Sequence, residues 1–214
     1  MKEKTFYKYV EKFLKNEYGC FSTEQKIGTT DVGFSDVVGI RDVGGQFSGD
    51  IEIISVEVKL YANNFGKLVG QALGYSVFAN KVYLAVPMGA YEGFTAEQKE
   101  IANRLGVGLI EINMKTKKCK EVLSSSYHSP IIGITYQVIN KMLYGKCCIC
   151  GSITFGTAKG SLKTALKKDA DLELNTIVKD EDGKERKLLF TRSKTQKKVS
   201  FVCKDCIKAL ELGD

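Results

Sequence analysis

The segment over residues 50–61, DIEIISVEVKLY, constrains the fold of this chain more than any other. Its apolar residues alternate over a length typical of a β-strand, which predicts a strand with one face in the core. Glu57 and Lys59 fall on the other face, two residues apart, in a run that is apolar enough for a central strand. Because burying unpaired charges is costly, these side chains are expected to pair, to bind a metal ion or to line a cleft.

The patterns around this strand predict an α/β sandwich. Helices are expected over residues 5–18, 63–80, 95–105 and 131–144, and strands over residues 21–27, 33–42, 50–61, 81–87 and 107–112. Thr95 and Gln98 form the capping box that begins the third helix, and Gly145 is expected to end the last one. A hairpin supplies antiparallel pairs and helical crossovers supply parallel ones, so we expect a central mixed sheet flanked by helices.

Charge and cysteine are distributed unevenly over the 214 residues. Residues 1–140 carry 16 basic and 15 acidic side chains, whereas residues 141–214 carry 16 and 10, so nearly all of the net charge of +7 lies in the last third. Five of the seven cysteines lie there too. We therefore divide the chain into an α/β domain over residues 1–145 and a basic, cysteine-rich α+β domain over residues 146–214.

Two CxxC pairs mark the second domain, Cys147 with Cys150 and Cys203 with Cys206. Four thiolates suit a tetrahedral, structural Zn²⁺ ion. The order of the pairs, with the second one opening a helical pattern, resembles a treble-clef zinc finger. Cys148 is the spare thiol, and the sequence leaves open whether Cys147 or Cys148 is the ligand; free cysteines are the alternative.

The basic residues of the second domain are candidates for phosphate binding. Between the cysteine pairs, a hairpin is expected to turn at residues 182–183, and a basic run follows it. The nucleic-acid-binding candidates in that run are Arg192, Lys194, Lys197 and Lys198. Such side chains neutralise backbone phosphates, although a solvated lysine-rich surface has the same composition.

The strand before Glu57 contains a second carboxylate, Asp36, flanked by valines. The sequence SDVVGI over residues 35–40, followed by Glu57-Val58-Lys59, resembles the signature of the PD-(D/E)xK nuclease superfamily, with Ser35 in place of the usual proline. The next predicted helix carries Gln71 and Tyr75, which is similar to the QxxxY motif of the RecB-like and lambda-exonuclease-like branch. The resemblance covers about residues 5–112.

The resemblance implies a restriction-endonuclease-like αβββαβ core and divalent-metal-dependent hydrolysis of phosphodiester bonds, with DNA as the expected substrate. Asp36 and Glu57 would ligate Mg²⁺ or Mn²⁺, with the Val58 carbonyl as a further ligand. The catalytic residues that it implies are Asp36, Glu57, Lys59, Gln71, Tyr75 and, on the first helix, Glu11. Lys59 would orient or help deprotonate the attacking water and stabilise the developing negative charge.

Composition limits the catalytic mechanisms and the cellular location that are expected. A single histidine, His128, excludes mechanisms that need a histidine pair or a histidine-rich metal cage. The apolar runs are too short to span a bilayer and the charged N-terminus lacks a secretory signal, so a cytoplasmic protein with no membrane partner is expected. The alternatives to a nuclease are an inactive nucleic-acid-binding protein of the same fold and a zinc-finger protein-interaction factor. Endonuclease or exonuclease action, DNA or RNA as the substrate, and oligomeric state, a homodimer included, stay open.

Overall fold

The computed structural model describes residues 2–44, 50–89, 92–142, 144–146, 153–155, 175–179 and 185–189. The chain divides into two compact units, Met1–Met142 and Leu143–Asp214. The boundary that the sequence analysis places at Gly145 falls three residues beyond the end of the first unit.

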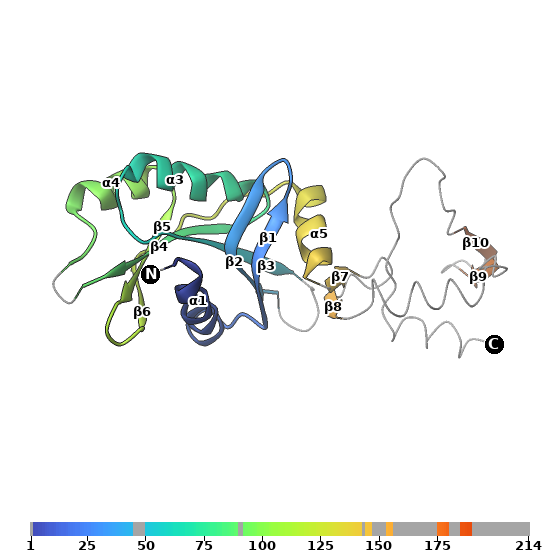
Figure 1. The fold of residues 1–214 in the computed structure, drawn as a ribbon. Helices are drawn as coiled ribbons and strands as arrows, with labels where there is room; N and C mark the ends of the chain where they lie inside the picture. Colours follow the sequence, from blue (N-terminus) through green and yellow to red (C-terminus); the bar gives the residue numbers. More distant parts are fainter. Residues whose placement is uncertain are drawn as a thin grey trace. The chain divides into compact units, whose positions relative to one another are not determined.

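A six-stranded mixed sheet forms the centre of the first unit (Figure 1). Its strands are Ser22–Thr29 (β1), Gly33–Asp42 (β2), Ile51–Val58 (β3), Lys81–Met88 (β4), Gly108–Asn113 (β5) and Cys119–Leu123 (β6). The strands lie in the order of the sequence; β1, β2 and β3 are antiparallel neighbours, β3, β4 and β5 are parallel, and β6 is antiparallel to β5. The predicted α/β class and mixed sheet are confirmed.

Helices cover both faces of this sheet (Figure 1). They are Lys4–Glu17 (α1), Phe65–Gly74 (α3) with the 3₁₀ turn Tyr75–Val77 (η1), Ala96–Arg104 (α4) and Ile132–Lys141 (α5). α1 lies on one face, α3 and α4 lie on the other, and α5 lies beside β1. The capping box predicted for α4 is present, because Thr95 Oγ1 accepts from the Gln98 backbone and Gln98 Oε1 accepts from the Thr95 backbone.

The alternation along β3 decides which side chains face which helix. Val56 and Val58 are fully buried in the apolar core that includes α1. Glu57, between them, points to the other face, where α3 lies, and contacts Gln71 of that helix. The fold therefore places one charged residue of a central strand under α3.

Several elements differ from the sequence-based expectations. β3 ends at Val58 and not at residue 61, so Lys59 follows the strand, although its N–H still bonds to the Ala85 carbonyl. The helix expected over residues 63–80 is shorter, and Tyr75 begins η1. Gly145 does not end the last helix, because α5 stops at Lys141.

β6 is absent from the sequence-based prediction. Its sequence, CKEVL, is short and carries two adjacent charges, and none of its five residues is buried, so no period-2 pattern distinguishes it from a loop. It forms by antiparallel pairing with β5.

The described part of the second unit consists of two short antiparallel pairs. Tyr144–Lys146 (β7) pairs with Ile153–Phe155 (β8), and Asn175–Lys179 (β9) pairs with Glu185–Leu189 (β10), with the predicted turn residues 182–183 between them in sequence. The predicted zinc ligands and basic residues lie outside the described residues; these are Cys147, Cys148, Cys150, Cys203, Cys206, Arg192, Lys194, Lys197 and Lys198. No helix in the described ranges is both long and apolar enough to cross a membrane.

Candidate active site

Two carboxylates lie buried where β2 and β3 stop pairing. Asp36 and Glu57 are 1% and 2% exposed. At this end of the hydrogen-bonded ladder, the last paired residues are Val37 and Val56. They are the chain neighbours of Asp36 and Glu57. The Asp36 Oδ2 atom accepts a hydrogen bond of 2.8 Å from the backbone N–H of Val58, the residue after Glu57, and the Asp36 charge acts on the Glu57 carboxylate.

Ser35 occupies the position of the motif's usual proline and is fully buried. Its hydroxyl lies 3.2 Å from the Val56 carbonyl and 3.1 Å from the Val37 carbonyl, and it accepts from the Ser55 hydroxyl at 2.8 Å. These side-chain bonds connect β2 to β3 just where the backbone ladder ends. Ser35 therefore holds the two strands together next to Asp36.

The Glu57 carboxylate receives three side-chain donors. Oε1 accepts from Gln71 Nε2 at 2.7 Å and lies 2.6 Å from Lys59 Nζ, and Oε2 accepts from the Tyr75 hydroxyl at 2.9 Å. Burial and the charge of Glu57 raise the pKa of Tyr75, so its hydroxyl keeps the proton that it donates. All three motif residues after Glu57 thus meet at its carboxylate.

Burial and the charge of Asp36 both raise the pKa of Glu57, against the lowering effect of Lys59 and Tyr75. The two buried carboxylates therefore repel each other. A divalent cation between them would offset that repulsion, and oxygen donors are the ligands that Mg²⁺ and Mn²⁺ prefer. Mg²⁺ is commonly held by one or two carboxylates, with waters and substrate phosphates completing its shell. The residues present fit such an ion.

Lys59 is held as an ammonium ion. Burial acts to lower its pKa, but the hydrogen bond to Glu57 and the charges of Glu57, Glu3 and Asp36 raise it overall. An amine that keeps its proton stabilises negative charge and does not serve as a base. The ion pair of the Lys59 ammonium with Glu57 therefore favours electrostatic stabilisation as the role of Lys59 over the proton abstraction that the resemblance also allows.

Two residues that no sequence motif indicates, Tyr7 and Lys26, also contact Asp36. The Tyr7 hydroxyl of α1 donates to Asp36 Oδ1 at 2.5 Å, and the Lys26 ammonium of β1 forms an ion pair with the same oxygen. Burial, followed by the hydrogen bond to Asp36, raises the pKa of Tyr7 to about 12, so this hydroxyl also stays protonated. In sequence Tyr7 is one more apolar residue of an amphipathic helix and Lys26 is one polar residue of an edge strand, so neither carries a local signal.

Glu11 is not joined to this site by any described contact. Its Oε2 atom accepts from Gln25 Nε2 of β1 at 2.7 Å. Within the described residues, no group of three or more Asp, Glu, His or Cys side chains is arranged to hold a metal ion. The structure thus brings together Asp36, Glu57, Lys59, Gln71 and Tyr75 and leaves Glu11 one turn beyond Tyr7 on α1.

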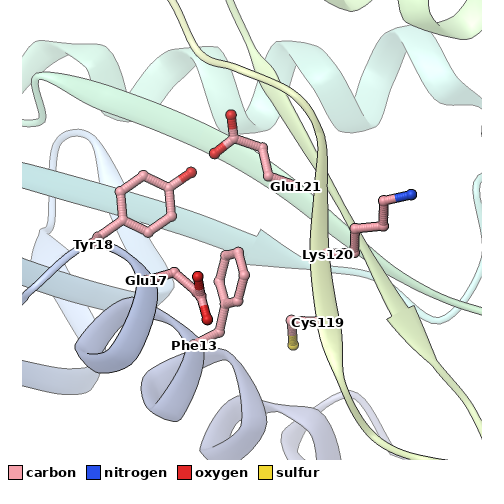
Figure 2. A pocket seen from close by; sticks show the side chains of 6 residues that line it. All are labelled: Phe13, Glu17, Tyr18, Cys119, Lys120 and Glu121. Atoms are coloured by element: carbon pink, nitrogen blue, oxygen red, sulfur yellow. The ribbon is translucent and has the colours of Figure 1, made fainter.

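A cavity of about 410 Å³ lies elsewhere, between α1 and β6 (Figure 2). Phe13, Glu17 and Tyr18 line it from α1 and the residue that follows it, and Cys119, Lys120 and Glu121 line it from β6. Burial raises the pKa of the Cys119 thiol to about 12, which leaves little reactive thiolate at neutral pH. None of the predicted catalytic residues lines this cavity, so it is separate from the candidate active site.

No protein-family model and no curated protein matches the chain. Among solved structures, the SPO1766 protein of unknown function from Silicibacter pomeroyi is similar to it, with 17% sequence identity and a TM-score of 0.45. That match covers 66% of this chain and 84% of the other.

Proposed function

We propose that the protein is a divalent-metal-dependent nuclease that hydrolyses phosphodiester bonds, with DNA as the expected substrate. The observation that carries the proposal is the pair of buried carboxylates, Asp36 and Glu57, with Lys59 bound to the second of them. Burying charged groups costs free energy and seldom stabilises a fold, so a charged cluster where two central strands stop pairing favours a chemical role. Gln71 and Tyr75 on the same carboxylate add the helix motif to that cluster.

Asp36 and Glu57 would hold the Mg²⁺ or Mn²⁺ ion, with the Val58 carbonyl as a further ligand. When bound, such an ion polarises a phosphoryl oxygen and makes water a better nucleophile at neutral pH. Tyr7 and the Val58 N–H fix the Asp36 carboxylate through one bond to each oxygen. The carboxylate is thereby oriented before any ligand arrives, which is the preorganisation that metal sites need.

The remaining side chains act on Glu57 and on the charge of the reaction. Gln71 and Tyr75 each donate to a different Glu57 oxygen and so fix the rotation of that carboxylate. The Lys59 ammonium stabilises the negative charge that develops on the phosphate during hydrolysis. The Tyr7 and Tyr75 hydroxyls keep their protons and donate hydrogen bonds to Asp36 and Glu57, so direct attack by water, with no covalent intermediate, is the expected route.

The second unit is proposed to be a basic zinc domain that binds nucleic acid. Its support is the CxxC spacing of Cys147, Cys150, Cys203 and Cys206 and the charge of +6 over residues 141–214. The phosphate-binding residues would be Arg192, Lys194, Lys197 and Lys198.

The test incubates the full chain with linear duplex, single-stranded and branched DNA and with RNA, in Mg²⁺, in Mn²⁺ or in EDTA. Cleavage of a DNA substrate in the presence of metal, absent in EDTA and absent in the Asp36→Asn variant, is expected. Salt-sensitive binding with no cleavage of any substrate would contradict the nuclease and favour the inactive nucleic-acid-binding protein.

A further inference from the structure

Asp36 is already neutralised by a side chain of its own protein. Its Oδ1 atom forms the ion pair with Lys26 and accepts from Tyr7, and its Oδ2 atom accepts from the Val58 N–H. The Lys26 side chain is 57% exposed whereas Asp36 is 1% exposed. Lys26 is therefore the solvent-facing partner of a carboxylate that solvent barely reaches.

The backbone at Lys26 is unusual for a lysine in a strand. Its φ of 56° lies in the left-handed region, midway along β1 and between the paired residues Gln25 and Ile27. Non-glycine residues rarely adopt this conformation, and it persists where the surroundings hold it, often at functional sites. The ammonium also lies 5.3 Å from the centre of the Tyr7 ring. Backbone, ring and carboxylate together place the Lys26 ammonium at Asp36 in the free protein.

Each carboxylate of the site thus has its own lysine, Lys26 on Asp36 and Lys59 on Glu57. Two carboxylates and two ammonium ions are together neutral. A divalent cation on the carboxylates would lie beside both ammonium ions and be repelled by them. Lys59 is 20% exposed, so the more exposed Lys26 has the greater freedom to move into solvent.

We propose that Lys26 is a built-in counter-cation of Asp36 that the divalent metal ion must displace, and that it keeps metal affinity low until a phosphate of the substrate gives the freed ammonium a new partner. This inference rests on the proposed function, and it assigns Lys26 as a positioning residue that couples metal binding to substrate binding. The free protein binds the metal weakly, and the complex with nucleic acid binds it more tightly.

The test measures Mn²⁺ binding by calorimetry, with electron paramagnetic resonance as a second readout, on the full chain without nucleic acid. Lys26→Asn and Lys26→Gly remove the charge, and both residues tolerate the left-handed backbone, so the strand is retained. Both variants are expected to bind Mn²⁺ about tenfold more tightly than the unchanged protein, because the repulsion from one ammonium is lost. Lys26→Arg keeps the charge and is expected to bind Mn²⁺ with the affinity of the unchanged protein.

Two further variants separate the charge from the hydrogen bond. Tyr7→Phe removes a donor from the same Asp36 oxygen without changing charge, and Lys12→Gln removes an exposed charge of α1 that takes part in none of the ion pairs among the described residues. Tyr7→Phe is expected to weaken Mn²⁺ binding, because it removes a hydrogen bond that orients Asp36, and Lys12→Gln is expected to leave Mn²⁺ affinity unchanged. Equal tightening by Tyr7→Phe, or unchanged or weaker binding in both Lys26→Asn and Lys26→Gly, would overturn the inference.

Asp36→Asn distinguishes the failure of this inference from the failure of the proposed function. If the unchanged protein binds Mn²⁺ and Asp36→Asn abolishes that binding, the metal site stands, and the Lys26 variants alone decide the inference. If Asp36→Asn has no effect on Mn²⁺ binding, both the inference and the proposed metal site are wrong.

Discussion

Lys59 contributes both to the stability of the fold and to the proposed chemistry. Its ammonium lies 2.6 Å from a Glu57 oxygen and is the cation bound to that carboxylate. Removing it leaves a buried carboxylate without a counter-charge, which costs free energy, whereas removing both charges leaves no such penalty. Stability and catalysis can therefore be separated by changing one or both residues.

Lys59→Met is expected to lower the free energy of unfolding by about 1–3 kcal/mol and the cleavage rate by about 100-fold. The double variant Glu57→Gln with Lys59→Met is expected to regain most of the lost stability, but none of the activity. Chemical denaturation and initial cleavage rates measure the two effects. Recovery of activity in the double variant would contradict the roles given to both residues.

At the residue scale, the site residues that belong to a spaced motif can be predicted from the sequence. The residues that only tertiary packing brings to Asp36 cannot. Asp36, Glu57 and Lys59 are identified because they occur in order on two strands, and Gln71 and Tyr75 because they are four residues apart. Tyr7 and Lys26 reach Asp36 from α1 and β1 through tertiary packing. The left-handed backbone of Lys26 has no sequence signal, because lysine is not a residue that favours it.

At the scale of elements, α1 packs closely on β2 because Gly39 has no side chain. A Cβ at Gly39 would lie 2.8 Å from Cys20 Sγ and 3.1 Å from Leu14 Cδ1. By contrast, a Cβ at Gly70, on the exposed side of α3, would meet nothing within 4 Å. The two glycines therefore form a matched pair for testing this packing.

Gly39→Ala is expected to destabilise the protein by about 1–3 kcal/mol because of overpacking. Gly70→Ala is expected to stabilise it by about 0.5–1 kcal/mol, since alanine favours a helix interior more than glycine does. Thermal or chemical unfolding measures both changes. Equal effects of the two substitutions would contradict the packing of α1 on β2.

A buried thiol in the turn after α1, that of Cys20, is expected to make the protein less stable at alkaline pH. Burial is the main cause that raises the pKa of the Cys20 thiol from 9.0 to about 12, although Arg41 acts to lower it. In the unfolded chain the thiol loses its proton at lower pH than in the folded protein, so the folded state binds more protons between these pKa values. The contribution of Cys20 to stability is therefore complete below pH 9 and is lost as pH rises toward about 12.

Unfolding free energies measured across this pH range are expected to fall more steeply for the unchanged protein than for Cys20→Ala. Parallel pH profiles for the two proteins would contradict the burial of this thiol.

The strongly patterned elements could be predicted and the short ones could not. β2 has the predicted bounds, and the capping box of α4 forms, because local sequence determines both. β6 depends on pairing with β5, and the end of β3 at Val58 depends on where its neighbours stop pairing, so neither is readable locally.

At the scale of the whole molecule, the α/β class follows from the order of helical and strand patterns, and the asymmetry of charge follows from simple counting. The zinc domain stays a prediction, since its cysteines lie outside the described residues. Loss of any one of its four thiolate ligands would release the zinc ion.

Metal analysis of the native protein is expected to find one zinc ion per chain, and Cys203→Ser is expected to lose it. Cys148→Ser and Cys147→Ser together decide which of these two thiols is the ligand, because only one of the variants should lose zinc. Unchanged zinc content in Cys203→Ser would contradict the pairing of the two CxxC motifs.

The central claim is that Asp36 and Glu57 form a hydrolytic metal site. The most direct test compares initial rates of DNA cleavage in Mg²⁺ for the unchanged protein, Glu57→Gln and Glu100→Gln, the last of which removes an exposed carboxylate of α4. We predict that Glu57→Gln lowers the rate by about 100-fold or more while it retains a cooperative unfolding transition, and that Glu100→Gln leaves the rate unchanged. Cleavage by Glu57→Gln at the rate of the unchanged protein would contradict the account.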